Sequence, residues 1–164
     1  MISFRVAVFA ACLSAVACND MVPRGITLGE IEALDPPLGE GSLWPKLSTL
    51  GDKVVLSWQE RDAENMWSVK MATLDEAGWA PAQTVARSTA EREFFVNWAD
   101  FASVDILKPD LLIAHWLLRG PTAGYDYGVR VARSMDGGRT WTEPWTPHTD
   151  ETRTEHGFVS KFPL

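Results

Sequence analysis

The clearest structural signal in the chain is the stretch Ser134-Met135-Asp136-Gly137-Gly138-Arg139-Thr140-Trp141. It follows the alternating run Gly128-Val129-Arg130-Val131, which is typical of a half-buried antiparallel strand. In a hairpin turn of this composition the Asp carboxylate accepts hydrogen bonds from turn amides, the glycines permit positive φ, and the Trp packs beneath the turn. The sequence therefore predicts a structural turn built by Ser134, Asp136, Gly138, Thr140 and Trp141.

The strands around this turn belong to a unit that occurs twice in the chain. Val54-Val55-Leu56-Ser57-Trp58 matches Leu112-Ile113-Ala114-His115-Trp116 at an offset of 58 residues. Val69-Lys70-Met71-Ala72 matches Val129-Arg130-Val131-Ala132 at an offset of 60 residues. Because the offset grows slowly, we expect equivalent strands joined by loops of slightly different length.

Each repeat contains about four strand-like runs, with Gly, Pro and Asp clustered between them. In the first repeat these are residues 43–50, 53–59, 66–74 and 79–86. In the second they are residues 93–98, 111–118, 127–134 and 140–145. A third copy begins at Gly157-Phe158-Val159-Ser160, which resembles Phe94-Phe95-Val96-Asn97.

Four antiparallel strands repeated at about sixty residues are typical of β-propeller blades. We expect an all-β fold: about two four-stranded antiparallel blades (residues 43–90 and 91–150) plus the first strand of a third (155–164). A β-sandwich of about eight or nine strands is the competing interpretation. A ring of six such blades needs about 360 residues. The chain is therefore expected to be the N-terminal part of a larger propeller, with assembly of several copies as the alternative.

The turn quoted above fits the pattern S-x-D-x-G-x-T-W and resembles the Asp-box of sialidases and related propellers. Trp44-Pro45-Lys46-Leu47, Asn97-Trp98-Ala99-Asp100-Phe101 and Glu155-His156-Gly157-Phe158-Val159-Ser160 are similar to segments of bacterial Asp-box lipoproteins of the exo-α-sialidase type. The resemblance covers residues 43–164. It implies a sialidase-like β-propeller whose intact relatives hydrolyse terminal sialic acid or similar glycosides without a cofactor.

The resemblance also implies which residues act on a glycan. Sialidases use a tyrosine nucleophile supported by a glutamate, an aspartate as acid/base, and three arginines that grip the sugar carboxylate. Asp100 is the acid/base candidate, and Lys46 stands where the first arginine is expected. Trp44, Trp98 and His156 are further ligand-binding candidates because we expect them in or beside innermost strands.

The full catalytic set of a sialidase is not expected in this chain. The only two tyrosines are Tyr125 and Tyr127, in the second blade, whereas the family's nucleophile comes from a late blade. A lysine in place of an arginine attracts an anion as a point charge but lacks the bidentate geometry. We therefore expect no hydrolysis by this chain alone, and a non-catalytic surface binding or assembly module is the second hypothesis.

The N-terminus predicts export. Residues 1–17 contain one Arg followed by a short apolar run of small residues, which is typical of a signal peptide. Ala15-Val16-Ala17-Cys18 resembles a lipobox, so we expect lipid attachment at Cys18 and a membrane-anchored protein facing the periplasm or cell surface. Cleavage by ordinary signal peptidase, giving a soluble exported protein, is the alternative. Residues 18–42, rich in Gly and Pro, are expected to form a tether.

Composition excludes some partners. The formal net charge is -7, and an acidic chain lacks the positive surface that nucleic acid binding requires. His148, Asp150 and His156 lie close in sequence, but their spacing matches no metal motif, so no metal site is expected. The sequence predicts no cofactor and leaves the oligomeric state open.

Overall fold

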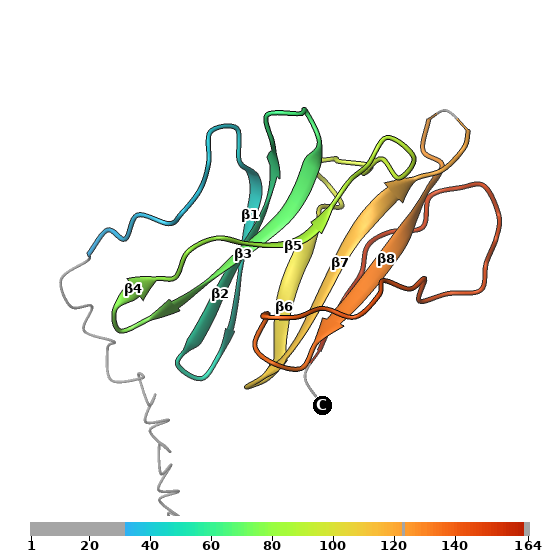
Figure 1. Cartoon of the computed structure of the whole chain (residues 1–164). Coiled ribbons are helices and arrows are strands. Elements are labelled where there is room, and N and C mark those ends of the chain that lie inside the picture. The colour runs from blue at the N-terminus through green and yellow to red at the C-terminus, as the bar shows by residue number, and fades with distance from the viewer. Residues whose placement is uncertain (1–31, 123, 163–164) are drawn as a thin grey trace, which may run out of the picture. The chain divides into compact units, whose positions relative to one another are not determined.

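The computed structural model describes residues 32–122 and 124–162 of the chain. The chain divides into two units, Met1–Ala33 and Leu34–Leu164, and each strand that the structure describes lies in the second unit. Within the described residues all regular secondary structure is β, with two antiparallel sheets and no helix (Figure 1). The all-β prediction is confirmed at this level. A closed propeller is not seen in the part of the chain that the structure describes.

The first sheet contains five strands. They are β1 (Leu43–Leu50), β2 (Lys53–Arg61), β3 (Trp67–Asp75), β4 (Gly78–Trp79) and β5 (Gln83–Arg87). The order is β1-β2-β3, with both β4 and β5 paired to β3. The first three predicted runs are confirmed. The fourth is split into β4 and β5 around Pro81, which has no N–H to donate to β3.

The second sheet has the order β6 (Ser103–Lys108), β7 (Leu111–Arg119), β8 (Tyr127–Ser134). The predicted runs at 111–118 and 127–134 are confirmed as β7 and β8. The predicted first strand at 93–98 is wrong, because there Phe94 makes only an isolated bridge to Leu118. The inner position belongs to β6, in which Val104 and Ile106 are buried and alternate with polar residues.

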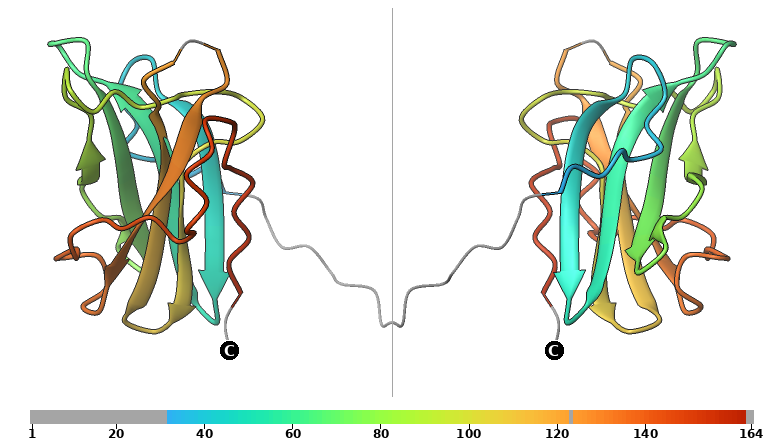
Figure 2. Two further views of the ribbon diagram at one scale, coloured as in Figure 1. Left: turned by 90° about the vertical axis from the view of Figure 1, so that its right-hand side faces the viewer. Right: turned by 90° about the vertical axis from the view of Figure 1, so that its left-hand side faces the viewer.

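Two further predicted strands are irregular. Residues 140–145 run beside β8 without forming a strand, held by Thr142 N to Arg133 O (2.9 Å) and by the bridge between Val131 and Trp145. Residues 157–162 form no regular secondary structure, with Phe158 at φ 58°, and they pair with no strand in the described part of the chain. Figure 2 shows this last segment, in dark red, running along the strands.

The main core lies between the two sheets, where β6 packs on β1 and β2. It contains Val55, Val69 and Met71 from the first sheet and Val104, Ile106, Leu112, Ala114, Trp116 and Ala132 from the second. Burial of these apolar side chains is the main stabilising contribution to the contact.

Polar side chains of the first sheet also bind the free edge of β6. Ser48 Oγ accepts a hydrogen bond from Ile106 N (3.0 Å), and Ser57 Oγ accepts one from Val104 N (3.1 Å). Just before the strand, Gln59 Oε1 accepts one from Ala102 N (3.4 Å). These contacts satisfy buried backbone donors of β6 and fix its position on the first sheet.

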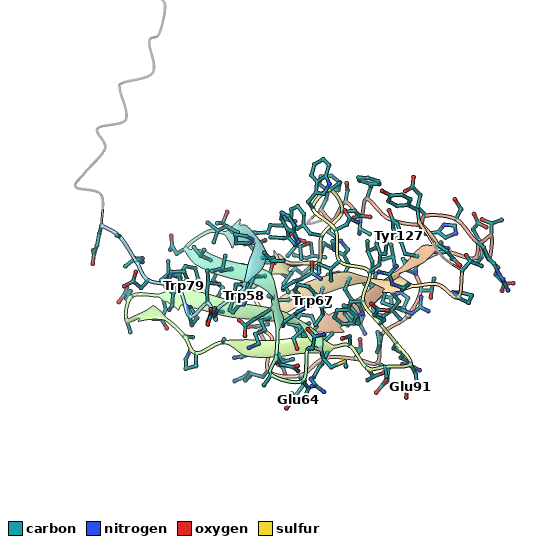
Figure 3. All side chains as sticks on the ribbon, turned by 90° about the horizontal axis from the view of Figure 1, so that it is seen from above. Trp58, Glu64, Trp67, Trp79, Glu91 and Tyr127 are labelled. Carbon is teal, nitrogen blue, oxygen red and sulfur yellow. The ribbon has the colours of Figure 1, made fainter. Side chains whose placement is uncertain are left out.

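The outer face of each sheet carries its own apolar cluster. On the first sheet Trp58 is fully buried with Leu56 and Ala72, beside Trp79 (Figure 3). On the second sheet the cluster is Leu117, Tyr127, Val129 and Val131, covered in part by Phe95 and Val159. Residues 157–162 therefore pack on the second sheet, on the side away from the first.

Candidate inner-strand site

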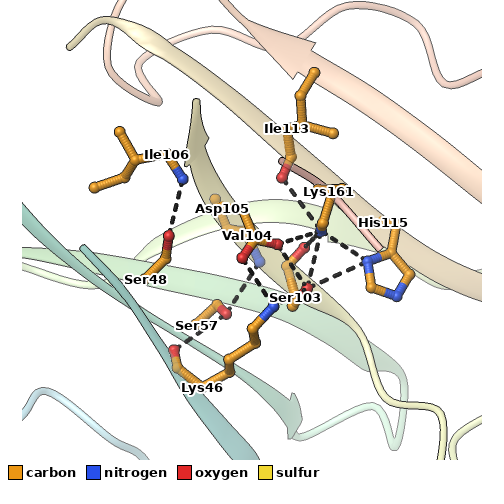
Figure 4. A network of polar contacts seen from close by, with 10 residues as sticks. All are labelled: Lys46, Ser48, Ser57, Ser103, Val104, Asp105, Ile106, Ile113, His115 and Lys161. Atoms are coloured by element: carbon orange, nitrogen blue, oxygen red, sulfur yellow. Dashed lines mark hydrogen bonds and ion pairs between the residues drawn. The ribbon is translucent and has the colours of Figure 1, made fainter. Parts of the chain in front are cut away.

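The inner strand β6 carries an acidic residue that binds two lysines from elsewhere in the chain (Figure 4). Asp105 Oδ1 lies 2.8 Å from Lys46 Nζ of β1, and Asp105 Oδ2 lies 2.6 Å from Lys161 Nζ. The side chains of Lys161 and Asp105 are 7% and 14% exposed, whereas that of Lys46 is 36% exposed. Two ammonium groups on one carboxylate leave a net positive charge here.

Burial and charge shift the pKa values of this cluster in different directions. Burial alone would raise the pKa of Asp105, but Lys161 and Lys46 outweigh it and hold that pKa below its ordinary range. Burial lowers the pKa of Lys161 to about 8, although Asp105 opposes the change. Lys161 is therefore mostly charged at neutral pH and depends on Asp105 for compensation.

Ser103 and His115 complete the cluster. Lys161 Nζ lies 2.8 Å from His115 Nδ1 and donates to Ser103 Oγ at 2.9 Å. Burial, with the charge of Lys161 next, lowers the pKa of His115 to about 3. The imidazole is therefore neutral at pH 7, and its Nδ1 lone pair accepts the lysine hydrogen bond.

A pocket of about 240 Å3 opens beside this cluster. Its lining comes from β1, β6, β7, the residues just before β6, and the C-terminal segment 157–162. The lining residues are Lys46, Ala99, Asp100, Phe101, Ser103, His115, Phe158, Val159 and Ser160. The fold thus brings Lys46 and Asp100, both singled out from the sequence, to one concave surface. No arginine lines this pocket in the described residues.

Asp100 is a buried carboxylate at the edge of this pocket. Its Oδ2 accepts a hydrogen bond from Phe158 N at 2.8 Å, and it lies so close to Gly157 that a Cβ there would overlap it. Burial raises the pKa of Asp100, and the nearby charge of Glu155 adds to the effect. A carboxyl group with a raised pKa suits proton donation.

Tyr127, at the start of β8, is the tyrosine nearest to Asp100. Its hydroxyl donates to Glu155 Oε2 at 3.3 Å. Burial, together with the charges of Asp100 and Glu155, raises its pKa to about 12. A raised pKa disfavours the phenolate, so these surroundings oppose a nucleophilic role for Tyr127.

The remaining ligand-binding candidates do not line this pocket. Trp98 was expected in an innermost strand but lies in the turn before β6, 74% exposed. Trp44 does lie in β1, but its indole Nε1 is buried without a hydrogen-bond partner in the described residues. His156 lies in a different pocket and stacks on His148, with ring centroids 4.5 Å apart. Cys18 lies outside the described residues.

The Asp136 turn has a dense set of internal hydrogen bonds. Asp136 Oδ1 accepts from Thr140 N (2.9 Å) and Ser134 Oγ (2.7 Å), and Oδ2 accepts from Thr140 Oγ1 (2.6 Å). The Thr140 bonds, followed by Ser134, lower the pKa of Asp136 to about 2. Gly138 has φ 97°, and a Cβ there would lie 2.8 Å from Cε of Met71 of β3. The turn therefore packs against the first sheet.

Trp141 closes this turn and packs at the edge of the main core, with Nε1 donating to Gly138 O at 3.1 Å. We expect Trp141→Ala to lower the free energy of unfolding by about 2–3 kcal/mol, because the ring is only partly buried. Asp136→Ala is expected to lower the free energy of unfolding by less than Trp141→Ala does. Urea unfolding of both variants measures this, and an unchanged midpoint in both would contradict a structural role.

Three residues of the cluster, Ser103, Asp105 and Lys161, were not singled out from the sequence. The alternation Ser103-Val104-Asp105-Ile106 was the available signal for β6, and it places Ser103 and Asp105 on one face. Lys161 carries no local signal, because its partners lie on strands far away in the chain.

Searches for related proteins give no match among family models, curated proteins or solved structures. The resemblance to Asp-box sialidases therefore stays a prediction from the sequence. In the described residues no group of three or more His, Cys, Asp or Glu side chains is arranged to hold a metal ion. The same residues contain no helix long and apolar enough to cross a membrane.

Proposed function

We propose that the chain is part of an exported, sialidase-like Asp-box propeller that binds acidic glycans at the inner-strand pocket and does not hydrolyse them alone. The observation that carries this proposal is the convergence of Lys46 and Lys161 on the single carboxylate of Asp105. Lys46, whose ammonium is partly exposed, lines the pocket beside this pair of lysines, and Asp100, whose pKa is raised by burial, lines it as well. Lys46 is therefore the group that the carboxylate of an acidic sugar would contact.

The arrangement of the two sheets supports the propeller part of the proposal. The first strand of each sheet, β1 or β6, carries one partner of the Lys46–Asp105 ion pair. From that strand the chain proceeds outward through antiparallel neighbours. The two sheets pack face to face through a common apolar core. This arrangement and the repeated sequence are as expected of neighbouring propeller blades.

The chemistry of the pocket favours binding over hydrolysis. Asp100 has the raised pKa of an acid catalyst, but a glycosidase also needs a nucleophile or a base opposite it. Tyr127, the nearest tyrosine, has a pKa raised to about 12. We therefore propose that this chain binds the glycan and does not hydrolyse it.

A matched pair of ligands and a matched pair of lysines test this function. Sialyllactose is expected to bind and lactose to bind at least about tenfold more weakly, because only the former carries a carboxylate. Lys46→Met is expected to weaken sialyllactose binding by about tenfold, with Lys53→Met, an exposed lysine of β2, as the control. Isothermal titration calorimetry measures both. Equal binding of the two sugars would contradict the proposal, as would release of a fluorogenic aglycone from a sialoside.

Export and lipid attachment are the second part of the proposal and rest on residues 1–18 of the sequence. We expect the protein to fractionate with membranes and Cys18→Ser to release it or block its processing. Mass spectrometry of the mature N-terminus checks this directly. An unmodified Cys18 at that terminus would contradict lipid attachment and leave the soluble exported form.

A further inference from the structure

His115 carries a hydrogen-bond donor that no other group of the described residues accepts. Its Nδ1 lies 2.8 Å from Lys161 Nζ and 3.2 Å from Ser103 Oγ. An ammonium group has donors and no acceptor, so Nδ1 presents its lone pair to Lys161 and carries no proton. The proton of the imidazole therefore lies on Nε2. Figure 4 shows this second ring nitrogen pointing away from the lysine.

Contacts on several sides hold Lys161 in this position. Its Nζ lies 2.6 Å from Asp105 Oδ2, and it donates to the Oγ and the carbonyl oxygen of Ser103 at 2.9 and 3.1 Å. Because this ion pair is largely screened from water, breaking it is costly. Lys161 is therefore a positioning residue, which fixes the tautomer and the direction of the His115 ring.

The Nε2–H of His115 belongs to a buried side chain at the wall of the inner-strand pocket. His115 is only 3% exposed, yet it lines that pocket together with Lys46 and Asp100. Its Nε2 keeps access to the pocket, whereas the unpaired Nε1 of Trp44 is enclosed by protein atoms. Hydrogen bonds made in surroundings of low dielectric constant are stronger than those made in water. An acceptor atom of a bound ligand is therefore the partner that this donor lacks.

Lys46 and His115 offer a ligand two donors of different kinds. Both lie beside the same serine, since Lys46 Nζ is 3.3 Å and His115 Nδ1 is 3.2 Å from Ser103 Oγ. Lys46 is charged and partly exposed, whereas His115 is neutral and fixed in direction. A carboxylate is attracted most strongly to the charged group. The neutral donor is left for an uncharged acceptor oxygen of the same ligand.

We propose that His115 Nε2–H binds an uncharged oxygen, a hydroxyl or an amide carbonyl, of the sugar held in the inner-strand pocket. This inference rests on the proposed function and adds a second contact to the one that Lys46 makes with the sugar carboxylate. His115 thereby selects acids that also carry a neutral acceptor. A ligand without that acceptor leaves the buried N–H unpaired and binds more weakly.

Nuclear magnetic resonance of the 15N-labelled protein tests the contact without any substitution. Long-range 1H–15N correlations are expected to show His115 as the Nε2–H tautomer in the free protein. Lactose and sialyllactose, each added above its dissociation constant, should both shift the His115 Nε2 signal. The other two histidines, His148 and His156, line a different pocket and serve as internal controls whose signals should stay unchanged.

Two substitutions measure the contribution of the contact to affinity. His115→Leu removes the donor and should weaken sialyllactose binding by about tenfold, as for one lost hydrogen bond. His115→Gln restores an N–H donor and should recover most of the affinity. Isothermal titration calorimetry measures both variants, and the resonance measurement on the wild-type protein decides the matter if His115→Leu does not fold.

The outcomes separate this proposal from the glycan proposal. A proton on Nδ1, an Nε2 signal that neither sugar shifts, or unchanged affinity of a folded His115→Leu variant would overturn the role of His115. Equal binding of lactose and sialyllactose, with both still shifting the Nε2 signal, would instead overturn the recognition of the carboxylate and leave the His115 contact standing.

Discussion

Asp105→Ala is expected to lower the free energy of unfolding by about 3–5 kcal/mol, because it leaves a buried lysine without its counter-charge. The Lys161 side chain is only 7% exposed, and its ion pair with Asp105 is 2.6 Å long. Removing the carboxylate also leaves Lys46 and Lys161 facing one another with like charge. Urea unfolding at neutral pH measures the loss.

The control for this variant is Asp110→Ala. Asp110 is 76% exposed and lies 3.9 Å from Lys53, an ion pair of the kind that contributes less than about 1 kcal/mol. We expect the midpoint of this variant to stay close to that of the wild type. Equal losses for Asp105→Ala and Asp110→Ala would show that the inner-strand cluster does not hold the sheets together.

Acidification is expected to destabilise the fold from about pH 6.5 downward, before most carboxylates titrate. The pKa of His115 falls from 6.5 to about 3 on folding. Below pH 6.5 the unfolded chain therefore takes up a proton that the folded chain excludes. The stability present above pH 6.5 is lost progressively down to pH 3, by on the order of 4 kcal/mol in total.

Carboxylates modify this profile at lower pH. Glu60 is held at a pKa of about 2 because Lys70 and Trp58 outweigh the cost of burial, so its contribution is lost as pH falls below 4.5. The raised pKa of Asp100 acts in the opposite direction and offsets part of the loss. The effect of His115 on the free energy of unfolding is therefore best measured between pH 6.5 and pH 5.

Urea unfolding at pH 7, 6 and 5 tests this dependence in the wild type and in His115→Gln. The wild type is expected to lose about 2 kcal/mol between pH 7 and pH 5, while the variant shows a flatter profile whatever its stability at pH 7. A wild-type stability that does not change with pH would contradict the neutral, buried imidazole. So would the same slope in both proteins.

The strands that the sequence predicts best are those with the strongest local pattern. β2 and β7 contain contiguous apolar blocks buried on both faces, and β3 and β8 alternate regularly. β6 was missed because Ser103 and Asp105 interrupt its apolar residues, while the aromatic pair Phe94-Phe95 suggests a strand earlier in the chain. Ser103 and Asp105 bind one another within β6 (3.1 Å), but they also bind Lys46 and Lys161 from elsewhere in the chain, and no local pattern reveals those contacts.

The candidate site was only partly predictable for the same reason. Lys46 and Asp100 were found as individual residues, and the pocket brings them together. The charge that makes the pocket attractive to an anion depends on Lys161, which reaches Asp105 only after the C-terminal segment has packed on the second sheet. Trp98 was placed at an inner strand because the second inner strand was assigned too early in the chain. His156 was placed beside the first strand of a third blade, but it stacks on His148 in a different pocket.

The Glu60 carboxylate on the outer face of the first sheet has a mechanical consequence. Glu60 Oε2 accepts hydrogen bonds from Gly39 N and Ser42 Oγ as well as from Trp58 Nε1, while Lys70 binds Oε1. The segment before β1 is therefore fastened to the central strand β2, and not only to the edge strand that it leads into. A pulling force applied upstream of Gly39 is shared by β1, β2 and, through Lys70, β3. Such load sharing resists the unzipping of β1 that an edge attachment alone would allow.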